Sequence, residues 1–190
     1  FNFYRLPGAP VFLLNGRAIT RTQGMMEQSG ELYKQASKLV ADRLSEETEL
    51  KIELTADRQA GTVQIQAQVE GADLSNTNLR LRLALTESDI AYKGINGIRK
   101  HDMVVRAMPG GEPGVSVTDG ALKYKGSVDL AGLKKELSNY LTNFEEDQGQ
   151  KFPAKPIDLE KLHVVAFVQD DATREILQAT VVSVSPAATE

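Results

Sequence analysis

Residues 79–85 read Leu-Arg-Leu-Arg-Leu-Ala-Leu, and this stretch decides the fold. Leucine occupies every second position, and arginine or alanine stands between the leucines. Because successive side chains of a β-strand point to opposite faces, this period predicts a strand with one buried face and one face in water. We therefore expect Leu79, Leu81, Leu83 and Leu85 to face one core.

The same alternation recurs on the N-terminal side of this stretch. Residues 50–54 and 63–69 alternate apolar side chains with polar ones. Turn-forming residues at 57–61 and 71–78 separate the three segments, and short connections between consecutive strands favour antiparallel pairing. Further strands, with a hairpin loop at 170–173, are predicted at 103–108, 121–130, 162–168 and 176–184.

Two segments have helical spacing instead. Apolar residues recur at intervals of three and four in 32–44, which predicts an amphipathic helix. Residues 131–144 have the same spacing in a looser register, so we expect a short crossover helix there, with a long loop as the alternative. Before the first helix, the apolar run 11–14 leads into Asn15-Gly16, a strong hairpin signal because both residues tolerate positive φ.

These patterns predict an α+β fold: a mainly antiparallel β-sandwich, Ig-like or similar, with an N-terminal ββα unit. We expect residues 1–45 to hold that unit, and residues 46–190 to hold the sandwich with one helical crossover near 131–144. A two-stranded hairpin and one helix cannot bury enough surface to be stable alone. The unit is therefore expected to pack on the sandwich, or to have its missing half upstream of Phe1.

The net charge, the hydrophobic runs and the cysteine count restrict the classes of protein to which this chain can belong. The net charge is -4, which argues against a nucleic-acid partner, since such a partner calls for a basic face. No apolar run approaches the roughly 20 residues of a membrane-spanning helix. The chain has no cysteine, so it cannot itself form disulfides, zinc thiolates or a thiol nucleophile. It begins at Phe1 without a signal segment, from which we expect a mature protein, an isolated domain or a proteolytic fragment.

Residues 6–17, Leu-Pro-Gly-Ala-Pro-Val-Phe-Leu-Leu-Asn-Gly-Arg, resemble the thioredoxin superfamily. Members carry a proline just before a hydrophobic strand that ends in an Asn-Gly or similar turn. The resemblance implies that residues 1–45 are a partial thioredoxin-like unit, and that the Ala9–Pro10 peptide bond is cis. It also implies that Ala9 and Pro10 contact a bound protein or peptide, and that a Cys-x-x-Cys motif lies upstream of Phe1.

The remainder of the chain is similar to exported bacterial proteins of unknown function, the outer-membrane-protein-28-related group. Four runs carry this similarity: 83–87, 92–97, 101–107 and 165–170. Those proteins join a thioredoxin-like domain to a C-terminal β-sandwich. The similarity implies an exported protein of the periplasm or cell envelope, and it implies no activity.

His101, Asp102 and Arg106 form a candidate polar cluster. His101 is a potential general base or ligand, but a histidine at the start of a strand more often bonds backbone or a neighbouring carboxylate. Arg106 is a potential anion-binding residue, but it more often points outward or pairs with an acid such as Glu87. With only His101 and His163 in the chain, we expect no metal site.

Three functions are consistent with these residues. The leading hypothesis is a non-enzymatic binding or interaction module of an exported thioredoxin-like protein, without a cofactor and with its oligomeric state open. The alternative is the C-terminal portion of a thiol-disulfide oxidoreductase whose cysteines lie upstream. A third hypothesis is a hydrolase, which requires a pocket that contains His101 and a nearby acid.

Overall fold

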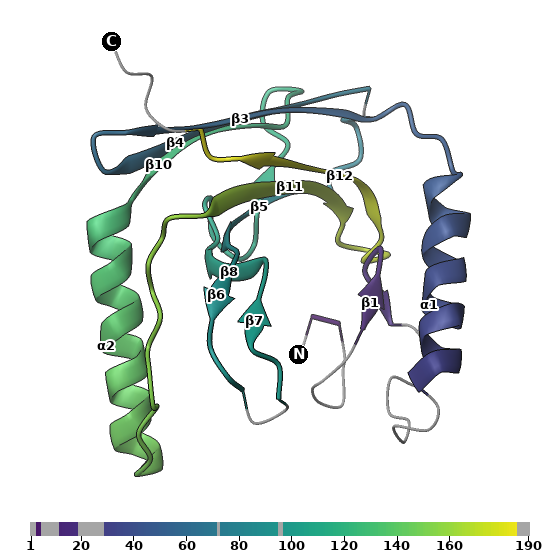
Figure 1. Cartoon of the computed structure of the whole chain (residues 1–190). Coiled ribbons are helices and arrows are strands. Elements are labelled where there is room, and N and C mark those ends of the chain that lie inside the picture. The colour runs from purple at the N-terminus through teal and green to yellow at the C-terminus, as the bar shows by residue number, and fades with distance from the viewer. Residues whose placement is uncertain (1–2, 5–11, 19–28, 72, 95–96, 186–190) are drawn as a thin grey trace.

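The computed structural model describes residues 3–4, 12–18, 29–71, 73–94 and 97–185 (Figure 1). Within these ranges the chain forms antiparallel sheets and two helices, so the predicted α+β class is confirmed. The helices are α1 (Ser29–Leu44) and α2 (Leu130–Gln148), which stand on opposite sides of the sheets in Figure 1. A small hairpin precedes α1, formed by β1 (Leu13–Leu14) and β2 (Arg17–Ala18).

Two antiparallel sheets form layers, one above the other in Figure 1. The upper sheet has the order β10-β4-β3, with bounds Lys123–Asp129, Thr62–Glu70 and Lys51–Gln59. The lower sheet has the order β12-β11-β5-β8, with bounds Ile176–Ser183, Leu162–Asp170, Leu79–Glu87 and Val104–Ala107. The short β9 (Val115–Ser116) also pairs with β5, and β6 (Ile90–Ala91) with β7 (Lys100–His101) forms a separate ribbon below.

One hydrophobic core lies between the layers. Val63 and Ile65 of β4, Leu81 and Leu83 of β5 and Val164 of β11 are all fully buried. These side chains belong to a single cluster that draws on both sheets. Apolar burial therefore holds the two sheets face to face, as expected from the period-two pattern in each strand.

Strand β5 is buried on both faces, and here the predicted wet face is wrong. Its four alternating leucines are at most 3% exposed, as predicted, but Arg82 and Thr86 on the other face are only 7% and 2% exposed. β5 is an inner strand of its sheet, and other parts of the chain cover that face. The Thr86 hydroxyl lies 3.6 Å from the Met103 sulfur, and the Phe3 ring lies 5.2 Å from the Arg82 guanidinium carbon.

The crossover helix α2 is longer than predicted at both ends, and the loop alternative is wrong. The Asp129 carboxylate caps its N-terminus by accepting hydrogen bonds from the backbone N–H groups of Ala131 and Gly132, at 3.0 and 3.1 Å. At the other end Gly149 has a φ of 62°, the left-handed conformation that ends a helix. These two caps fix where the helix begins and ends.

The N-terminal hairpin has the predicted turn, and it packs against the turn between β11 and β12. Asn15 and Gly16 both have positive φ, 48° and 78°. The Asn15 carbonyl accepts a hydrogen bond of 3.1 Å from the Ile176 N–H. A Cβ atom at Gly16 would lie 1.8 Å from the Arg174 carbonyl oxygen, so only glycine permits this approach.

We expect Leu83→Ala to lower the free energy of unfolding by roughly 2–5 kcal/mol, because it opens a cavity between the two sheets. Leu44→Ala is the matched control, since Leu44 is 81% exposed on α1. Urea denaturation of both variants measures the difference. Equal losses in the two variants would contradict a core placed between the sheets.

Candidate functional site

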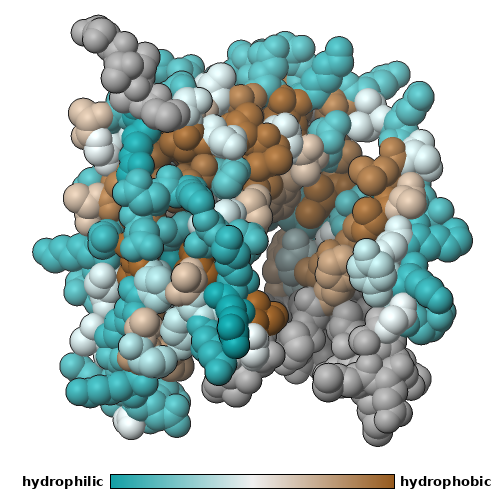
Figure 2. Space-filling model, viewed as in Figure 1, coloured by the Kyte–Doolittle hydropathy of each residue, from teal (hydrophilic) through white to brown (hydrophobic). Residues whose placement is uncertain are grey.

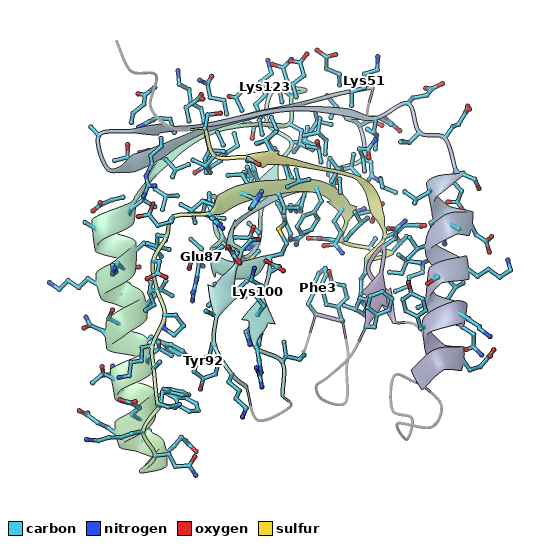
Figure 3. All side chains as sticks on the ribbon, in the orientation of Figure 1. Phe3, Lys51, Glu87, Tyr92, Lys100 and Lys123 are labelled. Carbon is cyan, nitrogen blue, oxygen red and sulfur yellow. The ribbon has the colours of Figure 1, made fainter. Side chains whose placement is uncertain are left out.

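A groove of about 270 Å³ lies between α2, the segment 152–156 and the strands β6 to β8. Figure 3 shows Glu87 under the lower sheet, with Tyr92 farther down toward the segment that runs along α2. Most of the lining is apolar or aromatic. The lining residues are Ile90, Tyr92, His101, Val104, Arg106, Leu141, Phe152, Ala154, Lys155 and Pro156.

The groove brings together two of the three residues of the predicted polar cluster. His101 and Arg106 line it, whereas Asp102 does not. The Asp102 carboxylate instead accepts a 2.7 Å hydrogen bond from the Asp89 N–H, which ties the two ends of the β6–β7 ribbon together. Asp102 therefore has a local structural role at the open end of the ribbon, opposite its turn.

His101 has the contact that the simpler interpretation predicts. Its Nε2 lies 3.0 Å from the Tyr92 carbonyl oxygen, and the two rings lie 6.2 Å apart. Because a carbonyl can only accept, Nε2 must carry the proton. No carboxylate lines the groove in the part of the chain that the structure describes. The hydrolase hypothesis requires an acid near His101 in the same pocket, and the described lining of the groove contains none.

Arg106 pairs with Glu87, the partner named from sequence as one alternative. The guanidinium Nε and Nη2 each lie 2.7 Å from Glu87 Oε2, and Nη2 also donates to the Pro156 carbonyl at 2.8 Å. The Glu87 side chain is only 3% exposed and that of Arg106 is 11% exposed. The second oxygen of Glu87 accepts from the Leu159 N–H. This pair joins β5, β8 and the segment that follows α2.

Asp89, just before β6, attaches the β6–β7 ribbon to the start of β11. Its carboxylate forms ion pairs with Lys100 of the ribbon and with Lys161, which precedes β11. Hydrogen bonds from these two ammonium groups lower the Asp89 pKa to about 2. The ribbon is therefore tied to the lower sheet by charge as well as by its backbone.

The far wall of the groove is held by the C-terminal turns of α2. Phe152 stacks on Phe144 with ring centroids 5.7 Å apart, and its N–H donates to the Glu145 carboxylate at 2.7 Å. Lys155 also pairs with Glu145. The Lys155 ammonium, followed by the Phe152 N–H, lowers the pKa of Glu145. The segment 152–156 thus forms one wall of the groove, and Glu145 holds it in place.

Sequence patterns alone indicate little of the aromatic part of this site. Leu141 was expected only as a position of the predicted helix. Phe152 lies in a polar, proline-containing segment that matches no motif. Side chains from four separated segments form the groove, so no residue spacing within one segment could predict it.

Some predicted features cannot be placed. Ala9 and Pro10, with the predicted cis bond between them, lie outside the described residues. Across the described ranges, no group of three or more His, Asp or Glu side chains is arranged to hold a metal ion. No helix of the described chain is long and apolar enough to cross a membrane.

No protein-family model matches the chain, and no curated protein matches it. Among solved structures, the chain is similar to a domain of the outer membrane lipoprotein Omp28 from Porphyromonas gingivalis. The two share 14% sequence identity with a TM-score of 0.46, and the match covers 74% of this chain and 100% of that one. So distant a likeness leaves the function to be argued from the residues of this chain.

We expect Glu87→Ala to destabilise the protein by roughly 3–5 kcal/mol, because it leaves the Arg106 charge buried without its partner. Glu46→Ala is the matched control. It removes an equally direct pair with Arg43, but the Glu46 side chain is 59% exposed, so we expect a loss of at most about 1 kcal/mol. Chemical denaturation distinguishes them. A loss for Glu87→Ala as small as that of the control would show that the pair does not join the walls of the groove.

We expect the Asp89 carboxyl to titrate near pH 2 in the folded protein, against 3.8 for the free side chain. Because folding lowers this pKa, the two ion pairs stabilise the fold above about pH 4 and cease to do so as the pH falls through about 2. Carboxyl-detected NMR follows the titration. Lys100→Met raises the midpoint toward 3.8, whereas Lys93→Met leaves it unchanged. A midpoint near 3.8 in the unmodified protein would refute the pairing.

Proposed function

We propose that this chain is a non-enzymatic binding module of an exported protein, and that its groove binds a small apolar ligand carrying one carboxylate. The observation that carries the proposal is the composition of the groove wall: apolar and aromatic side chains, two cations and no carboxylate among the described residues.

The apolar lining of the groove favours a ligand with an apolar group of limited size. Ile90, Val104, Leu141 and Phe152 offer aliphatic and aromatic surface on facing walls. Pockets for drug-sized ligands span roughly 300–1,000 Å³, and this groove lies just under that range at about 270 Å³. It therefore suits a single aromatic ring or a branched aliphatic group, either as a free acid or as the C-terminal residue of a peptide.

The charges select the head group. Arg106 and Lys155 line the groove, while their partners Glu87 and Glu145 lie behind them and outside the lining. Arg106 uses Nε and Nη2 for its contacts, and Nη1 has no hydrogen-bond partner within the described ranges. A guanidinium held rigidly by one carboxylate is preorganised to donate to a second. A ligand carboxylate beside Arg106 would receive that hydrogen bond.

Export and the thioredoxin-like N-terminal unit belong to the same proposal. The resemblance of residues 6–17 to the thioredoxin superfamily supports the unit, and so does the order β1, β2, α1. The similarity of the later runs to exported bacterial proteins supports a cell-envelope location. Contact of Ala9 and Pro10 with a bound protein or peptide stays a prediction of the resemblance.

We expect 3-phenylpropionate to bind with a dissociation constant in the millimolar range or below, measured by ¹H–¹⁵N chemical-shift titration. The neutral amide of the same shape should bind at least ~10-fold more weakly, because Arg106 and Lys155 favour an anion. A dipeptide ending in phenylalanine, with a free and then an amidated C-terminus, shows whether the groove prefers a peptide end.

Two variants test the groove in the same titration. Lys155→Gln removes one cation and keeps the apolar walls, so we expect weaker binding of the acid and unchanged binding of the amide. Tyr140→Glu adds a carboxylate on an exposed position of α2, 64% exposed, and should change neither affinity. Equal affinity of the acid and the amide, or shifts that avoid Ile90 and Leu141, would refute the proposal.

A further inference from the structure

An exposed row of aromatic rings continues the groove beside α2 outward. Phe152, which lines the groove, stacks on Phe144 with ring centroids 5.7 Å apart, and the Tyr140 ring lies 6.5 Å from that of Phe144. Tyr140 is 64% exposed and Phe144 is 43% exposed, and neither lines the groove. These three residues are called the aromatic row. A ligand that leaves the groove past Phe152 therefore meets two more rings.

The aromatic row is an exception on the surface of α2. Figure 2 shows mostly hydrophilic residues over this helix, whereas the hydrophobic residues gather nearer the sheets. Near its N-terminus the helix buries Leu130 and Leu133 in the core, but Tyr140 and Phe144 lie one to two turns beyond them and remain in water. Aromatic side chains are enriched at binding surfaces, because a rigid ring supplies contact area at a low cost in conformational entropy.

Two carboxylates flank the exposed rings along α2. Glu136 lies four residues before Tyr140. Asp147 lies three residues after Phe144, and side chains at these spacings share one face of a helix. Neither carboxylate forms an ion pair within the described ranges, and the lysines of this helix, at 134–135, fall on other faces. The charges beside the rings therefore favour a cationic ligand.

The cation that fits best is a guanidinium group. It is planar, so it can stack on an aromatic face and still donate hydrogen bonds to a carboxylate at its edge. The face of α2 that carries Tyr140 and Phe144 offers both kinds of partner, ring and carboxylate, within one turn of each other. The net charge of -4 also favours the approach of a cationic partner.

The spacing of the rings matches an extended peptide. An extended chain advances roughly 3.3–3.6 Å per residue, so side chains two residues apart lie on the same side at a separation of roughly 7 Å. The centroid distance of 6.5 Å between Phe144 and Tyr140 is close to that separation. A peptide whose last residue fills the groove beside Phe152 can thus place its second and fourth preceding side chains on these two rings.

We propose that the groove and the aromatic row together bind the C-terminal segment of a partner protein that ends in an apolar residue and carries arginine two and four residues before its end. This inference rests on the carboxylate site proposed for the groove and adds the class of partner. The terminal carboxylate lies beside Arg106, and the last side chain fills the groove. The nearer guanidinium lies over the Phe144 ring beside Asp147. The farther one lies over the Tyr140 ring beside Glu136.

The probe is the acetylated peptide Arg-Gly-Arg-Gly-Phe with a free C-terminus, compared with Gly-Gly-Gly-Gly-Phe in chemical-shift titrations of the whole chain. We expect the arginine peptide to bind at least ~10-fold more tightly, because each arginine adds a ring contact and an ion pair. Its binding should shift the ring resonances of Tyr140. 3-Phenylpropionate is too short to reach that ring and should leave its resonances unchanged.

Three variants locate the gain in affinity. Tyr140→Ala removes the outer ring, and Asp147→Asn removes one carboxylate beside the row, so each should weaken binding of the arginine peptide about 3-fold. Glu146→Gln is the matched control, since it removes an exposed carboxylate from the adjacent position on another face of α2 and should bind the peptide as the unmodified protein does. All three should keep their affinity for 3-phenylpropionate, which shows that the groove is intact.

The outcomes separate this inference from the proposed function. Equal affinity of the two peptides, or equal affinity of Asp147→Asn and Glu146→Gln for the arginine peptide, would overturn the inference and leave the groove proposal standing. Failure of 3-phenylpropionate to bind would refute the groove proposal, and this inference with it. Shifts of the Tyr140 ring with phosphatidylcholine vesicles, but not with the arginine peptide, would overturn the inference in favour of a lipid surface.

Discussion

The Glu87 carboxylate is the group on which the rest of the candidate site depends. It is 3% exposed, and it receives the Arg106 guanidinium from β8 and the Leu159 N–H from the segment after α2. A buried charge is tolerated only where partners satisfy it, so these contacts must form together. They join β5, β8 and the chain beside α2, and the last two of these supply parts of the groove wall. The Nε and Nη2 atoms of Arg106 are thereby held by Glu87, while the Arg106 side chain lines the groove.

A second arginine, Arg82 in the first half of β5, has a comparable role. The Arg82 Nη1 donates to Asp171 at 2.7 Å and to Gln169 at 3.1 Å. The amide of Gln169 in turn donates to the Tyr4 hydroxyl at 2.9 Å. Because Tyr4 precedes the N-terminal hairpin, this network ties the start of the chain to the lower sheet. β5 thus combines an apolar core face with two polar contacts, at Arg82 and Glu87, that position other segments.

The sequence was informative where structure follows from local periodicity. The leucines of 79–85, the Asn15-Gly16 turn and the helix near 131–144 all follow from spacing and turn chemistry, and the structure confirms them. The pairing of Arg106 with Glu87 was foreseen as one alternative, because an arginine among the apolar residues of a predicted strand often pairs with an acid. Spacing could not show that Arg82 is covered, since an alternating pattern is the same whether its second face meets water or another segment.

The groove itself could not be predicted, because its walls come together only in the folded chain. Tyr92 and Phe152 lie 60 positions apart in sequence, and each belongs to a segment without regular periodicity.

The central claim is that the groove held by Glu87 and Arg106 is a binding site for an apolar anion. Intermolecular nuclear Overhauser effects between 3-phenylpropionate and the methyl groups of the protein test it most directly. The account predicts contacts from the ring of the ligand to the methyl groups of Ile90, Val104 and Leu141. Contacts to Val40 and Leu177 beside α1 instead, or none at all with the ligand bound, would contradict it.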